Sequence, residues 1–171
     1  MDDVQLAKYE VSAEQMLHTV AKYVKQTDLA KRIGIKVQQL NTYMSGMSIP
    51  VKHYDKLNEV VAEISKELNG TTIGEDNPME QLKTLGKWVR LPWLLQEELG
   101  LTVRQATMRM SDKREGVYGK FTPEMLRIIN TAIIRASFEL MQIRVARPVQ
   151  ENTTQSKASS ASLQTSSNKT D

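Results

Sequence analysis

A segment of seventeen residues occurs twice in this chain, and this duplication constrains the fold more than any single residue does. The segment LAKRIGIKVQQLNTYMS at positions 29–45 aligns without a gap with LQEELGLTVRQATMRMS at positions 95–111. Apolar residues recur at matching positions, and Gly34 matches Gly100, as a short helix, a tight turn and a second helix require. We therefore expect one small helical unit to be present twice.

The likeness continues upstream, where residues 23–25 resemble residues 88–90 once one residue is inserted near Pro92. A chain of 171 residues suits one domain of ordinary size or two small ones, and the repeat favours two. The expected division is a first unit at residues 1–68, a linker at 69–77, a second, divergent unit at 78–147 and a Ser/Thr-rich tail at 148–171.

The composition argues against several classes of protein. Hydrophobic residues make up 40% of the chain but never form a run long enough for a membrane span, so we expect none. The N-terminus is acidic and lacks a basic start followed by an apolar stretch, which argues against a secretory signal. Because there is no cysteine, a disulfide framework, a thiolate nucleophile and a thiolate zinc site are excluded.

Charge is arranged in blocks along the chain, although the net charge is only +3. Residues 22–54 hold six Lys and Arg against one Asp, and residues 83–120 hold eight against four acidic residues. Between them, residues 55–82 hold seven acidic residues against two basic ones. Both basic blocks coincide with the duplicated segment. Localised basic surface suits a polyanion-binding protein, and a chance alternation of solvated faces is the alternative.

Apolar spacing and helix-end signals predict an all-α fold. Ser12 begins a capping box ahead of apolar residues at helical intervals. Thr27 is the expected N-cap of a short helix that stops at Gly34, because glycine tolerates left-handed geometry. In the second unit Pro92 opens the short helix, and Thr102 begins another capping box. The helices expected in the first unit lie at about 12–25, 28–33, 37–45 and 57–68, and Asn77 caps the first helix of the second unit.

The last helix is expected to run from 123 to 146 and to be longer than its counterpart in the first unit. It carries two apolar stripes, which need two partners. The first stripe is Leu126, Ile129, Ile133, Ala136, Leu140 and Ile143, and the second is Ile134, Phe138, Met141 and Val145. Packing of both stripes within the chain is favoured, and a homodimer through this helix is the alternative. The tail at 148–171 is poor in apolar residues and is expected to be disordered.

The first repeat has a small residue, Ala30, as the second residue of its short helix, followed by Gly34 and then by Leu40 facing the core. A small residue is needed there because the next helix crosses close above it. This spacing resembles the helix-turn-helix of the lambda-repressor-like (XRE) family of bacterial and phage regulators, over about residues 17–68. The resemblance implies two tandem helix-turn-helix units that bind double-stranded DNA, with the motif duplicated in one chain.

By that resemblance, the helix at 37–45 enters the DNA major groove with its N-terminal half forward. Gln38 and Asn41 are the expected base readers, because an amide can bond adenine N6 and N7 together. The full base-reading face is expected to be Gln38, Gln39, Asn41, Thr42 and Ser45, with Leu40, Tyr43 and Met44 facing the core. The expected phosphate contacts are Lys25, Gln26, Lys31, Lys36 and Lys52. A solvated, amide-rich face is the alternative.

The second repeat departs from the family pattern at packing positions. The replacements are Gln96 for Ala30, Ala106 for Leu40 and Arg109 for Tyr43. A long polar side chain at the crossing point forces wider helix spacing or a rotated short helix. Arg104 and Thr107 keep exposed positions, and Arg104 is suited to guanine. The long loop that follows offers further phosphate contacts at Lys113, Arg114 and Lys120. A divergent copy used for packing or for protein partners is the alternative.

These observations favour a sequence-specific DNA-binding protein, most simply a cytoplasmic, nucleoid-associated transcriptional regulator from a bacterium, phage or mobile element. Two units in one chain suit a pseudo-dimer with contacts one helical turn apart, about 34 to 36 Å. The alternative is a non-catalytic interaction or structural protein, such as a phage component, that keeps the shape without reading bases. No catalysis, cofactor, metal or small-molecule ligand is expected, because the histidines, His18 and His53, lie in different helical contexts.

Overall fold

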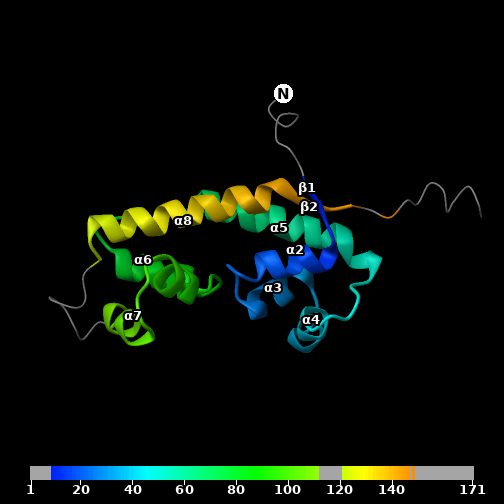
Figure 1. Ribbon diagram of the computed structural model, residues 1–171, viewed down its shortest axis with the longest axis horizontal. Coiled ribbons are helices and arrows are strands. Elements are labelled where there is room, and N and C mark those ends of the chain that lie inside the picture. Colours follow the sequence, from blue (N-terminus) through cyan, green and yellow to red (C-terminus); the bar gives the residue numbers. More distant parts are fainter. Residues whose placement is uncertain (1–8, 112–120, 147, 149–171) are drawn as a thin grey trace, which may run out of the picture.

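The computed structural model describes residues 9–111, 121–146 and 148, and this part of the chain is mostly helical, as expected (Figure 1). None of its helices has the length and hydropathy that a membrane span needs. A 3-10 helix (η1) and a π-helix (η2) accompany the α-helices. In chain order the elements are β1 (Tyr9–Val11), α2 (Ala13–Val20), α3 (Gln26–Ile33), α4 (Val37–Met44), η1 (Val51–His53), α5 (Tyr54–Asn69), α6 (Pro78–Leu85), η2 (Trp93–Glu98), α7 (Val103–Arg109), α8 (Pro123–Gln142) and β2 (Ile143–Val145).

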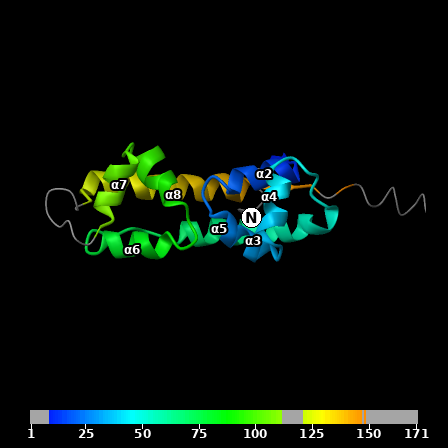
Figure 2. The same ribbon diagram turned by 90° about the horizontal axis from the view of Figure 1, so that it is seen from below.

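The core is built around α5 and α8, which lie side by side and run antiparallel (Figures 1 and 2). Ser65 of α5 and Ser137 of α8 are both buried where the helices meet. The hydroxyl of each serine donates to the backbone carbonyl oxygen of the other, at 2.8 and 2.9 Å. Because the exchange is mutual, the two helices meet at equivalent points, as they do across a two-fold axis.

Two asparagines repeat this relation on either side of the serines. Asn58 donates to the backbone carbonyl of Val145 at 2.9 Å and accepts from its N–H at 2.8 Å. Asn130 does the same to Ile73, at 3.0 and 2.8 Å. Each residue of one set lies 72 residues from its equivalent, the separation that also relates the serines. The first half of the fold (α2–α5) and the second half (α6–α8) are therefore related by a pseudo-two-fold axis.

A second contact between the halves obeys the same symmetry. Val24 and Val89 form an isolated antiparallel bridge. The flanking residues exchange two backbone hydrogen bonds, at 2.9 and 2.8 Å, which run from the N–H of Lys25 to Trp88 and from the N–H of Arg90 to Tyr23. These are the residues that the sequence alignment paired. The two halves therefore pack against each other through equivalent backbone segments.

A small parallel sheet of β1 and β2 was not expected from the sequence. Tyr9 pairs with Ile143, and Val11 pairs with Val145. The helix expected at 123–146 therefore ends at Gln142, where the backbone turns to the extended geometry of β2. The first helix is also shorter than expected, because it ends at Val20 and the following residues turn into the bridge at Val24.

The first apolar stripe of α8 packs within the chain, as expected, and only Ile143 of it is partly exposed. The second stripe is divided, because Val145 is buried in β2 whereas Ile134 and Phe138 are 44% and 50% exposed. Helix α8, with 20 residues, is longer than its counterpart α5, with 16, as expected, and the matched serines place its start opposite η1. The exposed Ile134 and Phe138 are compatible with the alternative, a homodimer through α8.

Two of the expected helix starts are confirmed. Ser12 and Thr102 each form a capping box with the glutamine three residues later. Thr27 is not the N-cap of α3, because the helix starts at Gln26, two residues earlier than expected, with Lys25 as its N-cap. Asn77 is the N-cap of α6, but its side chain makes no capping hydrogen bond.

A charge cluster at Arg32 joins α3 to α5. Its guanidinium donates to Asp28 on its own helix at 2.6 Å, and to Glu63 and Glu67 of α5 at 2.6 Å each. It also lies over the ring of Trp88 from the second half, 5.0 Å from the ring centroid. The hydrogen bond from Arg32 lowers the pKa of Glu67 below its ordinary value.

We expect Arg32→Met to lower the free energy of unfolding by about 1 to 3 kcal/mol at pH 7, because hydrogen bonds to charged groups are lost while the glutamates stay near water. The pKa of Glu67 is depressed in the folded state, so its contribution is present above the ordinary carboxyl pKa and is lost as the pH falls below it. Urea unfolding at pH 7 and at about pH 3 measures this. An equal difference between wild type and variant at both values would contradict the assignment.

Candidate nucleic-acid interface

The helices α3 and α4 are joined by a tight turn at Gly34. Gly34 has a φ of 88°, in the left-handed region that favours glycine, and its N–H donates to the carbonyl of Ala30 at 2.9 Å. Ala30 and Leu40 are both buried, so α4 packs closely on α3. Tyr43 is buried as expected, whereas Met44 is only half-buried. The inner side of α4 is thereby fixed, and its outer side is left to solvent.

All the expected base-reading residues of α4 are exposed, namely Gln38, Gln39, Asn41, Thr42 and Ser45. Gln39 donates to the hydroxyl of Tyr43 at 3.0 Å, and the Thr42 and Ser45 hydroxyls donate to backbone carbonyls of their own helix at 2.9 Å. Within the described part of the chain, no hydrogen bond occupies the side-chain amides of Gln38 and Asn41. These two amides are therefore the groups of α4 that are free to bond a ligand.

Basic side chains from both halves line a hollow beside the start of α4. The hollow has a volume of about 670 Å³ and is lined by the first residues of α3 and by Val37 of α4. Lys22 and Lys25 enter it from the first half, and Arg90 enters it from the second. Arg90 is held in place, because its guanidinium donates to the carbonyl of Lys22 at 2.8 Å. Three cations at the start of a helix make this hollow suited to an anion.

The matching hollow of the second half is mostly apolar. Leu91 and Pro92 line it where Gln26 and Thr27 line the first hollow. Leucine has no polar side-chain group, and proline lacks a backbone N–H, so the side-chain donors of Gln26 and Thr27 have no counterparts here. Two further matched pairs line both hollows, namely Val37 with Val103 and Met44 with Met110.

Helix α7 presents the expected candidates of the second repeat. Gly100 repeats the left-handed turn with a φ of 75°. Arg104 and Thr107 are exposed on α7, and the Thr107 hydroxyl donates to the backbone carbonyl of Val103 at 2.9 Å. Arg109, at the position of the buried tyrosine of α4, is half-buried.

One extra residue of the second half is accommodated in η2. Val24 matches Val89 but Gly34 matches Gly100, so the second half holds one more residue between these points. The π-helix takes up this residue in a wider turn, and the N–H of Leu99 donates to a carbonyl five residues back, at 3.1 Å. The insertion expected near Pro92 is thus located within η2.

Because of this insertion, Leu95 occupies the crossing position that the sequence comparison assigned to Gln96. Leu95 is 2% exposed and Ala30 is 1% exposed, whereas Gln96 is only half-buried. Leu95 lines the same hollow as the buried Ala106, so a large and a small residue meet there. In the first half the small Ala30 and the large Leu40 are both buried. The large and the small residue are thus exchanged between the two helices. The prediction that Gln96 lies at the crossing, and there forces wider helix spacing or a rotated short helix, is wrong in its placement of Gln96.

The expected phosphate contacts are only partly brought together. Lys25 and Gln26 line the basic hollow, and the exposed Lys36 is the N-cap of α4 beside it. Lys31 in the last turn of α3 and Lys52 in η1 are exposed and do not line this hollow. The candidates Lys113, Arg114 and Lys120 lie outside the described residues.

The helices α4 and α7 lie on the same side of the molecule. Figure 1 shows both below the layer of α5 and α8, and Figure 2, which views this side directly, shows them in opposite halves of the molecule. One face of the fold thus presents both candidate recognition helices, with the Val24–Val89 bridge joining the two halves.

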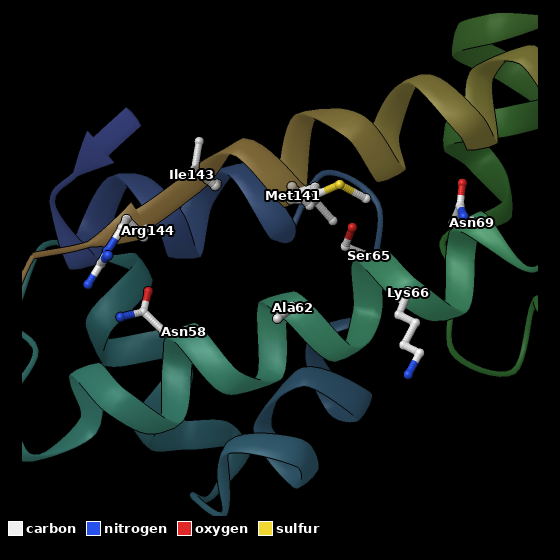
Figure 3. Close-up of a pocket in the computed structure, with 9 residues that line it drawn as sticks. Asn58, Ala62, Ser65, Lys66, Asn69, Met141, Ile143 and Arg144 are labelled. Atoms are coloured by element: carbon white, nitrogen blue, oxygen red, sulfur yellow. The ribbon is translucent and has the colours of Figure 1, made fainter. Parts of the chain in front are cut away.

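A separate hollow of about 470 Å³ lies between α5 and the end of α8, lined by residues such as Asn58, Ser65, Lys66 and Arg144 (Figure 3). The amide of Asn58 and the hydroxyl of Ser65 are already bonded to backbone groups across the helix pair. This hollow therefore lies along the pseudo-two-fold interface, where Asn58 and Ser65 join the two halves.

Sequence reasoning missed two residues of the basic hollow, Lys22 and Arg90. It also missed a matched pair of exposed apolar residues, Val37 and Val103, at the starts of α4 and α7. Apolar side chains in this position suit contact with a thymine methyl group. The sequence alignment pairs Arg90 with Lys25, and this pairing was the one sequence feature that pointed to both residues. They come together in space only through the backbone bridge between the two halves.

Comparison of the chain with protein-family models gave no match, and comparisons with curated proteins and with solved structures gave none either.

Proposed function

We propose that this chain is a sequence-specific DNA-binding protein with two tandem helix-turn-helix units, and that it regulates transcription. One observation carries the proposal. The exposed amides of Gln38 and Asn41, which no hydrogen bond occupies in the described chain, share α4 with Val37, which lines the hollow that holds Lys22, Lys25 and Arg90. Base-reading groups and phosphate-binding groups are thereby placed on neighbouring surfaces.

The chemistry of the two groups fits the two parts of a duplex. An amide of Gln38 or Asn41 donates from its nitrogen to adenine N7 and accepts at its oxygen from N6, a pairing open only in the major groove. The cations of the hollow neutralise phosphates and fix the register of α4 on the backbone. The matched α7 brings Arg104, whose guanidinium suits guanine O6 and N7.

The test is the double variant Gln38→Ala/Asn41→Ala. We expect it to weaken binding to the preferred duplex by about 1 to 3 kcal/mol for each lost base contact and to relax specificity. Fluorescence anisotropy with the preferred duplex and a scrambled one measures both effects. Asn69→Ala, which removes an exposed amide from α5, is the control and should bind as wild type does. Undiminished binding by the double variant would refute the assignment.

The second candidate is a non-catalytic interaction or structural protein that keeps the helix-turn-helix shape without reading bases. The exposure of Ile134 and Phe138 on α8 favours it, because exposed apolar residues on one helix face suit a protein partner. A salt titration separates the two candidates, since binding to DNA weakens steeply as salt rises. No detectable binding of any duplex at about 50 mM salt would favour the interaction protein.

A further inference from the structure

We infer that a single molecule of this chain binds a DNA site composed of two unlike half-sites in inverted orientation. This inference rests on the proposed DNA-binding function and specifies its target. It follows from three features of the fold: a pseudo-two-fold axis, unlike side chains at matched positions, and an internal interface that already joins the two halves.

The axis determines the orientation of the half-sites. Matched residues exchange matched hydrogen bonds at two separate places, between Ser65 and Ser137 and around Val24 and Val89. Helices α4 and α7 lie on one side of the molecule, in opposite halves (Figure 2). When a protein docks on DNA through two-fold related units, the half-sites run in opposite directions. A direct repeat would require units related by translation instead.

The matched side chains of the two recognition helices differ in the base they suit. Gln38 of α4 corresponds to Arg104 of α7, and Asn41 corresponds to Thr107, all four being exposed. Amides pair with adenine, whereas a guanidinium pairs with guanine. The half-site under α4 is therefore adenine-containing, and the half-site under α7 has a guanine at the corresponding position.

The anchoring of the two units on the backbone also differs. The polar side chains of Gln26 and Thr27 line the hollow beside α4, whereas Leu91 and Pro92 line the hollow beside α7 at the matched positions. A phosphate that accepts from Gln26 or Thr27 therefore has no side-chain donor at the matched positions of the second hollow. The complex is therefore asymmetric in its backbone contacts as well as in its base contacts.

One chain suffices because the interface that would join two separate units is internal. The inner face of α5, with Ile64 and Leu68, and that of α8, with Ile129 and Ile133, are fully buried in one core. The serine and asparagine hydrogen bonds between these helices are also satisfied within the chain. The expected stoichiometry is one chain for each pair of half-sites.

Selection of bound sequences from a random duplex pool by the full-length chain tests the inference. We expect two unlike half-sites in inverted orientation, and one chain per duplex by sedimentation. In synthetic duplexes, Arg104→Ala should lose about 5- to 150-fold in affinity through one half-site only. Gln38→Ala/Asn41→Ala, which removes two base contacts, should lose a larger factor through the other half-site only. The sensitive half-site is identified by mutating each half-site in turn.

The possible outcomes separate this inference from the proposed function. A palindromic site that binds two chains, a direct repeat, or Arg104→Ala with unchanged affinity would each overturn the inference and leave sequence-specific binding intact. A pool without any enriched sequence would instead overturn the proposed function. Circular dichroism of both variants establishes that they are folded, so a loss of affinity is not a loss of structure.

Discussion

Replacing Leu95 with alanine is expected to lower the free energy of unfolding by about 2 to 5 kcal/mol. Leu95 is 2% exposed and packs at the crossing of η2 and α7, beside Ala106. Removing its side chain leaves a void that the wider turn of η2 cannot close. The buried Trp93 in the same helix reports the transition, so urea unfolding followed by tryptophan fluorescence measures the loss.

The double variant Leu95→Ala/Ala106→Leu is expected to recover most of that loss, because it gives the second half the pairing of sizes found in the first. Ala106→Leu alone is expected to cost about 1 to 3 kcal/mol, since an intact leucine leaves no room for it. The reciprocal double variant Ala30→Leu/Leu40→Ala is the matched control and should be tolerated similarly. Strict additivity of the two single effects would show that these residues do not share one packing site.

Local signals in the sequence were sufficient to predict the helical character of the chain and the geometry of its two glycine turns. Gly34 and Gly100 have positive φ values, and the capping boxes at Ser12 and Thr102 form. These are local features, in which a residue and its near neighbours determine the conformation. The sheet of β1 and β2 was missed because each strand has three residues, too few for a periodic pattern, and each depends on a partner far away in the sequence.

The misassignment of Gln96 has a related cause. A gapless alignment of the repeats places Gln96 opposite Ala30, but the extra residue lies inside η2 rather than before it. Sequence similarity does not reveal where a helix widens its turn. The burial of the side chains reveals where the turn widens, since Leu95 and not Gln96 is packed in the core.

The part of the candidate interface that lies on α4 could be predicted from the sequence. The part to which both halves contribute side chains could not. The exposed face of α4, with Gln38 and Asn41, follows from helical periodicity and the resemblance to a known motif. Lys22 and Arg90 approach each other only because the bridge at Val24 and Val89 brings distant backbone segments together. Such contacts between halves determine the charge of the hollow.

Removal of the three cations of the hollow is expected to have the largest effect on DNA binding. Each lost phosphate contact lowers the slope of log affinity against log salt by about 0.9, so Lys22→Gln/Lys25→Gln/Arg90→Gln should lower it by roughly 2.7. At about 50 mM salt the affinity should then fall on the order of a thousandfold, whereas near 1 M salt the variant and the wild type should converge.

The control for that variant is Lys56→Gln/Lys66→Gln/Arg144→Gln, which removes three exposed positive charges from α5 and β2, outside the basic hollow. Both variants change the net charge equally, so a general attraction between protein and DNA would be weakened equally in both. If the hollow binds phosphates, only the first variant changes the salt slope by the stated amount. Equal slopes for the two variants would show that the net charge, and not the arrangement of Lys22, Lys25 and Arg90, determines the affinity.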